Sequence, residues 1–195
     1  MAVLRFNGSQ EIGEPVSWVL GVLVSLFSII KIYNIFNINA YISGSSIGLI
    51  VGLVLHELAH RYVSRRNGLY AEFVAYKPGL LLTALSGFIP NIILITPGYV
   101  KTTIYSYVPG LEKAITRSVA AGPATNLILS LLGYLAAHVA GSTETHIFLA
   151  DFASINAWVA FFNLLPIPPL DGSKLFRYNK MLWGALIILS LILLL

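Results

Sequence analysis

The chain alternates long apolar stretches with short polar connections, and the apolar stretches predict its architecture. About 20 apolar residues are needed for a helix to cross the hydrocarbon core of a membrane. Five stretches reach or approach this length, and the last is the shortest: residues 16–36, 42–62, 115–139, 147–165 and 181–195. The pattern predicts an all-α polytopic membrane protein with about five to six transmembrane helices. Because the last stretch is short for a crossing, a continuation of the natural chain beyond Leu195 stays open.

A sixth apolar stretch, residues 80–100, has a different character. It contains Gly87, Pro90, Pro97 and Gly98, and β-branched residues are frequent in its second half. Glycine, proline and β-branched residues favour turns and strands over a helix. We predict a small membrane-associated β segment here, between the second and third spans. An ordinary spanning helix is the alternative that the pattern leaves open.

Composition supports the membrane interpretation, because 57% of the 195 residues are hydrophobic, only 10% are charged and the mean hydropathy is +0.82. Soluble domains carry about 25% charged residues, so this chain has too few polar side chains for a water-facing surface. Disordered chains are rich in charge and poor in apolar residues, and are excluded too. The chain has no cysteine, which excludes disulfides and thiolate metal ligands. A net charge of +4 fits cytoplasmic loops, and no nucleic-acid partner is expected.

The basic residues predict an orientation. With the N-terminus inside and five crossings, eleven of the twelve Lys and Arg residues fall on the cytoplasmic side, and the outer connections 37–41 and 140–146 contain none. Lys31 is the exception, and its place near the end of the first span predicts that its ammonium reaches outward to the interface. A full crossing at residues 80–100 would move Arg117 and the later basic clusters outside. Charge therefore favours five spans.

The second span ends in His56-Glu57-Leu58-Ala59-His60. Two histidines four residues apart lie on one face of a helix and can bind one zinc ion. Glu57 could then act as general base on a zinc-bound water, whose pKa the metal lowers. A pair of histidines packed in a helix bundle is the alternative, but ionisable residues inside a span are expensive without a function. We therefore predict a metal site.

A catalytic zinc ion needs a third protein ligand and one open position. Asp171 follows a proline-rich segment, 163–170, where the fourth span reaches the cytoplasmic side. Prolines there end the helix, and Gly172 permits a close turn. We favour Asp171 as the third ligand, with a simple turn as the alternative. The remaining acids and histidines stand in a cytoplasmic loop or at outer helix ends: Glu72, Glu112, His138, His146 and Asp151.

The predicted topology brings three motifs to one depth near the inner face. The second and fourth spans both run inward and carry His56, His60 and Asp171, and the third span carries Gly122-Pro123-Ala124-Thr125-Asn126 near its inner end. The amides of Asn126 and Asn163 could hydrogen-bond a substrate or a tetrahedral oxyanion, or cap the backbone beside the nearby prolines.

Glycines recur every four residues along the second span, at Gly44, Gly48 and Gly52. Small residues at this spacing let another backbone approach the helix closely. Packing within the helix bundle is the use that we favour, and approach of a substrate is the alternative.

Three of these motifs resemble the signature motifs of the site-2 protease family of intramembrane zinc metalloproteases, in the same order. They are residues 56–60, residues 121–126 (Ala-Gly-Pro-Ala-Thr-Asn) and residues 163–172 (Asn-Leu-Leu-Pro-Ile-Pro-Pro-Leu-Asp-Gly), and the similarity extends over roughly residues 42–177. The resemblance implies a core of about six membrane helices, three of which hold the active site.

The resemblance also implies roles for single residues. His56, His60 and Asp171 would be zinc ligands, and Glu57 would be the base. Asn126 and Asn163 would contact the substrate or the transition state. Residues 97–101 are similar to the membrane-embedded β region of the family, which implies that Gly98, Tyr99 and Val100 pair with an unwound substrate.

The sequence therefore predicts one membrane-embedded protease domain, residues 1–195 with a core at 42–177, that binds one Zn2+ per chain. Its expected reaction is hydrolysis of a peptide bond in the transmembrane segment of a single-span substrate protein, which is regulated intramembrane proteolysis. The expected location is the cell membrane, as a multi-pass protein with the active site towards the cytoplasm. The alternatives are a zinc-binding transporter, which needs ionisable residues throughout the bilayer, and a catalytically silent scaffold, which does not need Glu57.

Overall fold

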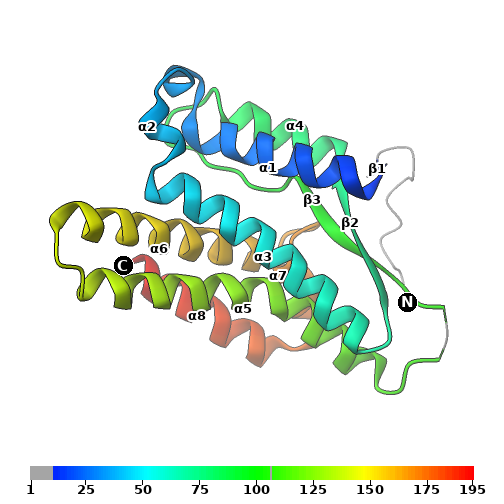
Figure 1. Ribbon diagram of the computed structural model, residues 1–195. Helices are drawn as coiled ribbons and strands as arrows, with labels where there is room; N and C mark the ends of the chain where they lie inside the picture. Colours follow the sequence, from blue (N-terminus) through cyan, green and yellow to red (C-terminus); the bar gives the residue numbers. More distant parts are fainter. Residues whose placement is uncertain (1–10, 106) are drawn as a thin grey trace.

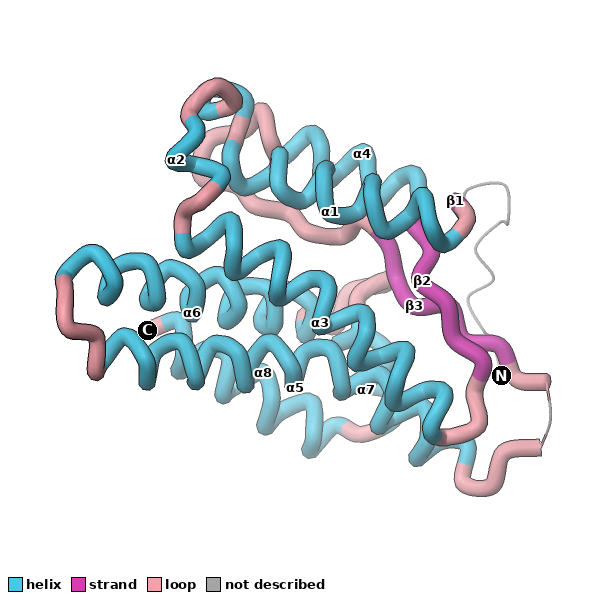
Figure 2. Tube along the Cα trace, viewed as in Figure 1, coloured by secondary structure: helices cyan, strands magenta, loops and turns pink. Residues whose placement is uncertain are grey.

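The computed structural model describes residues 11–105 and 107–195, and this part of the chain is mainly helical with one small sheet (Figures 1 and 2). The elements in chain order are β1 (Glu11–Ile12), α1 (Glu14–Ile30), the 3-10 helix η2 (Ile32–Asn34), α2 (Ile38–Tyr41), α3 (Gly44–Arg66), β2 (Tyr70–Tyr76), α4 (Lys77–Ser86), β3 (Gly98–Thr103), α5 (Leu111–His138), α6 (Thr143–Leu164), α7 (Asp171–Tyr178) and α8 (Lys180–Leu194). The prediction of a mainly helical protein with a small β segment is confirmed.

Three helical segments among the described residues are long and apolar enough to cross a membrane, namely Ile38–Arg66, Leu111–His138 and Thr143–Leu164. They correspond to the second, third and fourth predicted spans. The first and fifth predicted spans are shorter apolar helices, because α1 has 17 residues and α8 has 15. The structure thus describes a membrane protein with three clear candidate spans, and the total of five to six is not confirmed.

Helices α3, α5 and α6 pack side by side, and α8 covers α5 and α6, whereas α1 and α4 form a separate layer next to α3 (Figure 1). The glycines of α3 face α6. A Cβ atom at Gly44 would lie 1.9 Å from the carbonyl oxygen of Phe148, and one at Gly48 would lie 2.9 Å from the Cα of Phe152. Such distances are far below van der Waals contact, so these glycines allow the two backbones to touch. The packing interpretation of the glycine repeat is confirmed.

The sheet has the strand order β1-β2-β3, and both pairs are antiparallel. In the longer pair, Tyr70 is opposite Thr103 and Ala75 is opposite Gly98. Both strands cross from the α1 and α4 layer towards the end of α3, and β3 is at the edge of the sheet (Figure 2). Strand β2 lies between the second and third predicted spans, where a cytoplasmic loop was predicted.

The stretch 80–100 consists of the end of a helix, an irregular connection at residues 87–97 and the start of a strand, so neither prediction for it holds throughout. A spanning helix is wrong, because α4 ends at Ser86, where the backbone N–H of Gly87 bonds the carbonyl of Ala84 in a tight turn. The β interpretation is wrong for residues 80–86, which are helical, and right from Gly98 onward. Pairing with β2, which is a long-range contact, decides where the strand begins.

Lys31 is buried, and the prediction that its ammonium reaches outward is wrong. Only 4% of the residue is exposed, and its Nζ donates to the carbonyl oxygens of Ser86, at 2.9 Å, and Ile92. The backbone of Lys31 is left-handed, with φ of 66°, which ends α1 and turns the side chain back into the protein. Lys31 therefore joins the end of α1 to the connection between α4 and β3.

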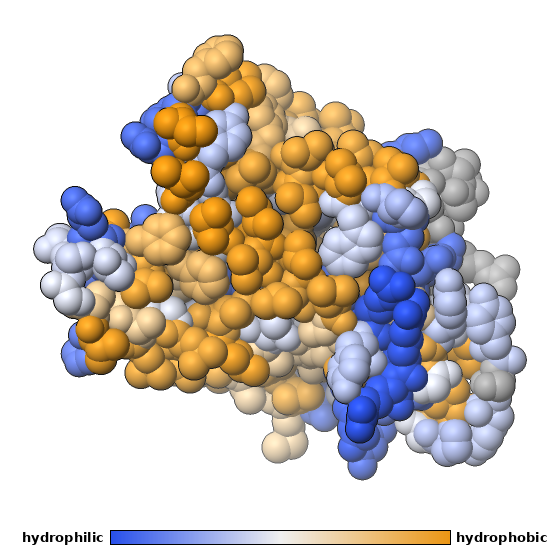
Figure 3. Space-filling model, in the orientation of Figure 1, coloured by the Kyte–Doolittle hydropathy of each residue, from blue (hydrophilic) through white to orange (hydrophobic). Residues whose placement is uncertain are grey.

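The surface has an apolar body, a large hydrophilic area at one end and smaller hydrophilic areas at the other end (Figure 3). Large apolar side chains are exposed along the helices, for example Leu23 on α1 and Ile128 and Leu135 on α5. Hydrophilic residues gather at the end of the molecule where α3 terminates in Arg65 and Arg66 (Figure 3). A body of this kind suits hydrocarbon, and the hydrophilic end suits the interface and water.

Candidate metal centre

The site begins with the second half of α3, which carries His56, Glu57 and His60. The three side chains are buried, with 2%, 6% and 6% of each residue exposed. Because the histidines are four residues apart, their rings stand one above the other, and the two Nε2 atoms lie 3.0 Å apart. Helix geometry therefore brings two of the three candidate ligands together without any distant contact.

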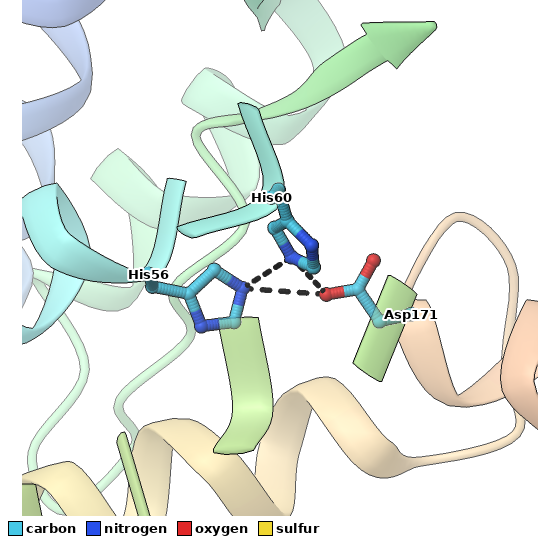
Figure 4. Close-up of side chains that lie close together, drawn as sticks. All are labelled: His56, His60 and Asp171. Atoms are coloured by element: carbon cyan, nitrogen blue, oxygen red, sulfur yellow. Dashed lines mark hydrogen bonds and ion pairs between the residues drawn. The ribbon is translucent and has the colours of Figure 1, made fainter. Parts of the chain in front are cut away.

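Asp171 completes the group from α7 (Figure 4). Its Oδ2 lies 2.8 Å from Nε2 of His60 and 3.3 Å from Nε2 of His56. The chain leaves α6 at Leu164, passes through the proline-rich segment and starts α7 at Asp171. A Cβ at Gly172 would lie 2.0 Å from the carbonyl oxygen of Leu164, so only glycine lets α7 begin this close to α6. The predicted close turn is present.

The three residues form a group that could hold a metal ion, since one ligand atom from each lies within 4.8 Å of the others. Two further observations show that a metal fits. Oε2 of Glu57 is buried beside the group without a hydrogen-bond partner. In addition, a Cβ at Gly122 of α5 would lie 2.2 Å from Nε2 of His60 and 2.6 Å from Nε2 of His56, so glycine keeps the space at both ring nitrogens open.

The second nitrogen of each imidazole has a partner on α5. Nδ1 of His60 lies 2.6 Å from the carbonyl oxygen of Ser118, which can only accept, so Nδ1 carries a proton and, in the neutral imidazole, Nε2 presents the lone pair. Nδ1 of His56 lies 2.5 Å from Oδ1 of Asn126. A histidine that donates from one nitrogen and presents the other is the usual arrangement of a zinc ligand.

The charge of Asp171 suits the same role. Burial alone would raise the pKa of its carboxyl group, but the nearby His60 and the Lys174 ammonium hold that pKa below its usual range. Nζ of Lys174 lies 4.0 Å from Oδ1 of Asp171, the oxygen that points away from the histidines. The carboxylate is therefore ionised, as a metal ligand must be.

A small cavity of about 30 Å³ opens onto the group, which is space for a water molecule and not for a peptide. Most of the site residues predicted from the sequence line this cavity. The complete lining is His56, Glu57, His60, Thr96, Gly98, Tyr99, Val100, Asn163, Pro169, Leu170 and Asp171. The predicted strand residues and the predicted metal ligands therefore face one space, although 38 residues or more separate them along the chain, counted from His60 to Gly98.

Asn126 lies outside this lining and behind His56. It is fully buried, and its amide nitrogen donates to Oδ1 of Asn156 on α6 at 2.9 Å. The substrate role of Asn126 stays a prediction. Asn156 was not selected from the sequence, although a lone amide in the middle of an apolar span was a usable signal, since such groups are expensive in a membrane helix.

The other candidate ligands lie elsewhere. Glu72 is on β2, where its Oε2 accepts from the Tyr70 hydroxyl at 3.4 Å, and Glu112 is in the first turn of α5. His138 ends α5, 16 residues beyond Gly122, which corresponds to roughly 24 Å of helix. Within the described residues, the grouped histidines and acids are those of His56, His60 and Asp171.

Two histidines and a carboxylate, with a buried glutamate next to the first histidine, are the donor set of catalytic zinc sites in metallohydrolases. Because His56, Glu57 and His60 are buried on a helical segment that is long and apolar enough to cross a membrane, this set is typical of membrane metal-dependent hydrolases. Comparison with known proteins agrees with the class.

A protein of Methanocaldococcus jannaschii is 33% identical over 187 residues, which cover 94% of this chain and 92% of that protein. A protein of Mycobacterium tuberculosis (strain H37Rv) is 36% identical over 139 residues, 69% of this chain and 30% of that protein. A protein of Bacillus subtilis (strain 168) is 32% identical over 149 residues, 66% of this chain and 65% of that protein. They are named "Putative zinc metalloprotease" MJ0611, Rip3 and YwhC, respectively.

No protein-family model matches the chain, and no solved structure matches it. The similarity to the first relative spans nearly the whole of both chains. The chain therefore belongs to the site-2 protease family of zinc metalloproteases. Zinc is accordingly its metal, and the resemblance read from the three motifs is confirmed.

Proposed function

We propose that this protein is an intramembrane zinc metalloendopeptidase that hydrolyses a peptide bond in a transmembrane segment of a substrate protein. The observation that carries the proposal is the place of the donor group. His56, Glu57 and His60 are buried in a helical segment, Ile38–Arg66, that is long and apolar enough to cross a membrane. A reaction at this group would take place below the membrane surface.

His56, His60 and Asp171 are the zinc ligands in this proposal, and each chain binds one ion. When bound, zinc polarises the scissile carbonyl and lowers the pKa of a coordinated water. The three side chains would hold the ion, and the cavity beside them would admit the water that the ion activates. The separations of 2.8 to 3.3 Å between Asp171 Oδ2 and the two Nε2 atoms suit donors that converge on one small ion.

Glu57 is the general base. It takes a proton from the attacking water and returns that proton to the nitrogen of the leaving amine. Its Oε2 is buried without a partner at the edge of the cavity, so a water in the cavity is the group that this oxygen can bond. Its neighbours on α3 are the two ligands, which places base and metal on one rigid element.

Strand β3 receives the substrate. A helical substrate holds its carbonyls in its own hydrogen bonds and must unwind before cleavage. An extended peptide can add to the edge of a sheet, and β3 is the edge strand whose residues Gly98, Tyr99 and Val100 line the cavity together with the ligands. We therefore assign these three residues to the substrate strand.

Asn163 contacts the substrate or the developing oxyanion. It is in the last turn of α6 and lines the cavity, where its amide donates to the carbonyl of Val159 at 3.0 Å. That bond uses one of the two amide hydrogens, and the second is available to an oxygen in the cavity.

In this proposal the protein is a multi-pass protein of the cell membrane, and its metal site faces the cytoplasm. The metal group is at the end of α3 that carries Arg65 and Arg66, and basic residues are concentrated in loops on the cytoplasmic side under the positive-inside rule. In this arrangement α1 and α8 supply the further crossings, and the substrate is a single-span membrane protein.

Cleavage in liposomes tests the proposal. Purified protein is reconstituted with a candidate single-span substrate, and the products are sized and sequenced by mass spectrometry with and without a chelator. Cleavage inside the apolar segment that stops with chelator and returns with zinc is expected. Zinc transport without proteolysis would favour a transporter, substrate binding without any cut would favour a scaffold, and a cut confined to soluble segments would refute intramembrane cleavage.

A further inference from the structure

Two buried amides connect His56 to the interface between α3 and α6. Oδ1 of Asn126 lies 2.5 Å from Nδ1 of His56, and Nδ2 of Asn126 donates to Oδ1 of Asn156 at 2.9 Å. Nδ2 of Asn156 donates to two backbone carbonyls, those of Gly48 at 3.1 Å and Phe152 at 2.8 Å. Asn126 and Asn156 are both fully buried, so their side chains are surrounded by protein and bond these protein groups. We call this series, from the two carbonyls to His56, the amide relay.

The carbonyls fix the direction of the amide relay. A carbonyl oxygen only accepts, so the nitrogen of Asn156 must face Gly48 and Phe152, and its oxygen must face Asn126. Asn126 must then present its nitrogen to Asn156 and its oxygen to His56. Reversing either amide would place two donors or two acceptors against each other inside the protein, at a cost of about 1–3 kcal/mol for each buried group left unpaired.

The direction of the relay decides which nitrogen of His56 carries its proton. Because Oδ1 of Asn126 only accepts, Nδ1 of His56 must donate, and in the neutral imidazole that binds a metal the lone pair is on Nε2. Nε2 is the atom that faces His60 and Asp171. His60 reaches the same state through one bond to a backbone carbonyl, whereas His56 depends on two side chains.

Gly52 leaves the room that the relay needs. It lies one turn before His56 on α3, and a Cβ there would be 2.3 Å from Oδ1 of Asn156 and 2.9 Å from Nδ2 of Asn126. These are the two atoms of the central hydrogen bond. Gly52 therefore differs from Gly44 and Gly48, whose nearest neighbours across the interface are backbone and aliphatic atoms of α6.

We propose that Asn126 and Asn156 are positioning residues that hold His56 in the tautomer and orientation required for zinc, and that Gly52 belongs to the same device. Neither amide is among the residues that line the cavity, so the inference gives both of them a role that acts through His56. Removing the group that hydrogen-bonds the non-coordinating nitrogen of a histidine ligand typically weakens metal binding by about 10- to 100-fold. This inference rests on the assignment of His56 as a zinc ligand and is independent of where cleavage takes place.

Zinc affinity of the purified protein tests the amide relay without any protease assay. Two variants break it, Asn156→Leu, which removes the second amide at similar volume, and Gly52→Ala, which keeps both amides and crowds their hydrogen bond. Two matched controls are Asn67→Leu, an amide outside the cavity lining whose side chain donates to the carbonyl of Val63 at 2.7 Å, and Gly133→Ala, a glycine of α5 that faces Ala153. The readouts are the zinc dissociation constant by chelator competition, the visible spectrum of bound Co2+ and thermal unfolding of metal-free protein.

The amide relay predicts 10- to 100-fold weaker zinc binding and an altered Co2+ spectrum in Asn156→Leu and Gly52→Ala, with both controls within about twofold of the original protein. If Asn156→Leu does not fold, Gly52→Ala and Asn156→Ser, whose hydroxyl is too short to reach Asn126, decide the question. Folded relay variants with unchanged affinity and spectrum would overturn the inference. His56→Ala distinguishes failure of the amide relay from failure of the ligand assignment. If His56→Ala loses zinc while the relay variants bind it normally, only the relay is refuted. If His56→Ala binds zinc fully, the assignment of His56 as a ligand is refuted.

Discussion

The two sides of the cavity are built in different ways. On the metal side, His56 and His60 come from one helix, they are almost completely buried, and each has a fixed partner for Nδ1. On the strand side, Gly98, Tyr99 and Val100 are partly exposed and belong to an edge strand that is held by pairing with β2. The metal side is thus defined by helix geometry and buried hydrogen bonds, and the strand side by a long-range pairing.

The difference separates two kinds of effect. Changes on the metal side should alter zinc binding and therefore everything that depends on it. Changes on the strand side should leave zinc in place and alter only the handling of the substrate. The following variants test this separation, beginning with the largest expected effect.

Asp171→Ala removes the proposed ligand that comes from outside α3. Its carboxylate lies within 3.3 Å of both Nε2 atoms, so we expect zinc affinity to fall by more than the about 10- to 100-fold that loss of a partner behind a ligand costs. Metal analysis of the purified variant measures the effect. Asp151→Ala, an exposed aspartate near the start of α6, is the control and should keep its zinc. A full complement of zinc in Asp171→Ala would remove Asp171 from the ligand set.

Gly122→Ala tests the metal side without removing a polar group. Its Cβ would fall within 2.6 Å of both Nε2 atoms, so the imidazoles must move, and we expect zinc affinity to fall about 10- to 100-fold. Alanine favours a helix more than glycine does, so weakened binding would not result from a weakened α5. Gly184→Ala on α8, whose Cβ meets open space, is the control. Unchanged affinity would show that the metal does not occupy this space.

Gly98→Ala tests the strand side. A Cβ here would lie 2.4 Å from the carbonyl oxygen of Val74 and 2.9 Å from the Cα of Ala75, so β3 must shift. We expect zinc binding within about twofold of the original value and cleavage of a membrane substrate slower by about tenfold or more, because small misplacements of bound substrate are costly. Gly13→Ala, with no atom within 4 Å of its Cβ, is the control. Loss of zinc together with cleavage would mean that the two sides are not separate.

Glu14→Gln has the smallest expected effect. It changes a partly exposed ion pair that connects the two sides of the cavity. Oε1 of Glu14 lies 2.8 Å from Nη1 of Arg61, the residue after His60, and also accepts from the backbone N–H of Phe73 on β2 at 3.4 Å. The pair is partly exposed, so its loss should lower the free energy of unfolding by about 0.2–1 kcal/mol, and less in high salt. Thermal unfolding at two salt concentrations measures this, with Glu144→Gln as control. A large loss of zinc would show that the sides are coupled through this pair.

The same contrast explains how much the sequence could predict. His56, Glu57 and His60 follow from spacing in one helix, and the proline-rich segment with Gly172 marks the turn that delivers Asp171. The strand side was only partly predictable. Residues 80–86 form a helix and β2 was missed, because strand pairing between residues 70–76 and 98–103 depends on contacts that no local pattern contains.

Lys31 and Asn156 show a second limit of sequence patterns. A lysine near the end of an apolar helix is typical of a side chain that reaches the interface, yet the left-handed backbone of Lys31 directs its ammonium to two carbonyls inside the protein. Asn156 is an isolated amide in the sequence of an apolar helix, and the fold brings Asn126 of another helix within hydrogen-bond distance of it. Buried polar groups find partners that are distant along the chain, and their roles follow from those partners.

The central claim, that Glu57 acts as general base beside a zinc ion bound by the two histidines and Asp171, is tested most directly by Glu57→Gln. Zinc content and cleavage of a single-span substrate in liposomes are measured on the same preparation. We predict a full complement of zinc and cleavage slower by about 100-fold or more, because the glutamine amide cannot accept the proton of the attacking water. Undiminished cleavage by the zinc-loaded variant would contradict the account.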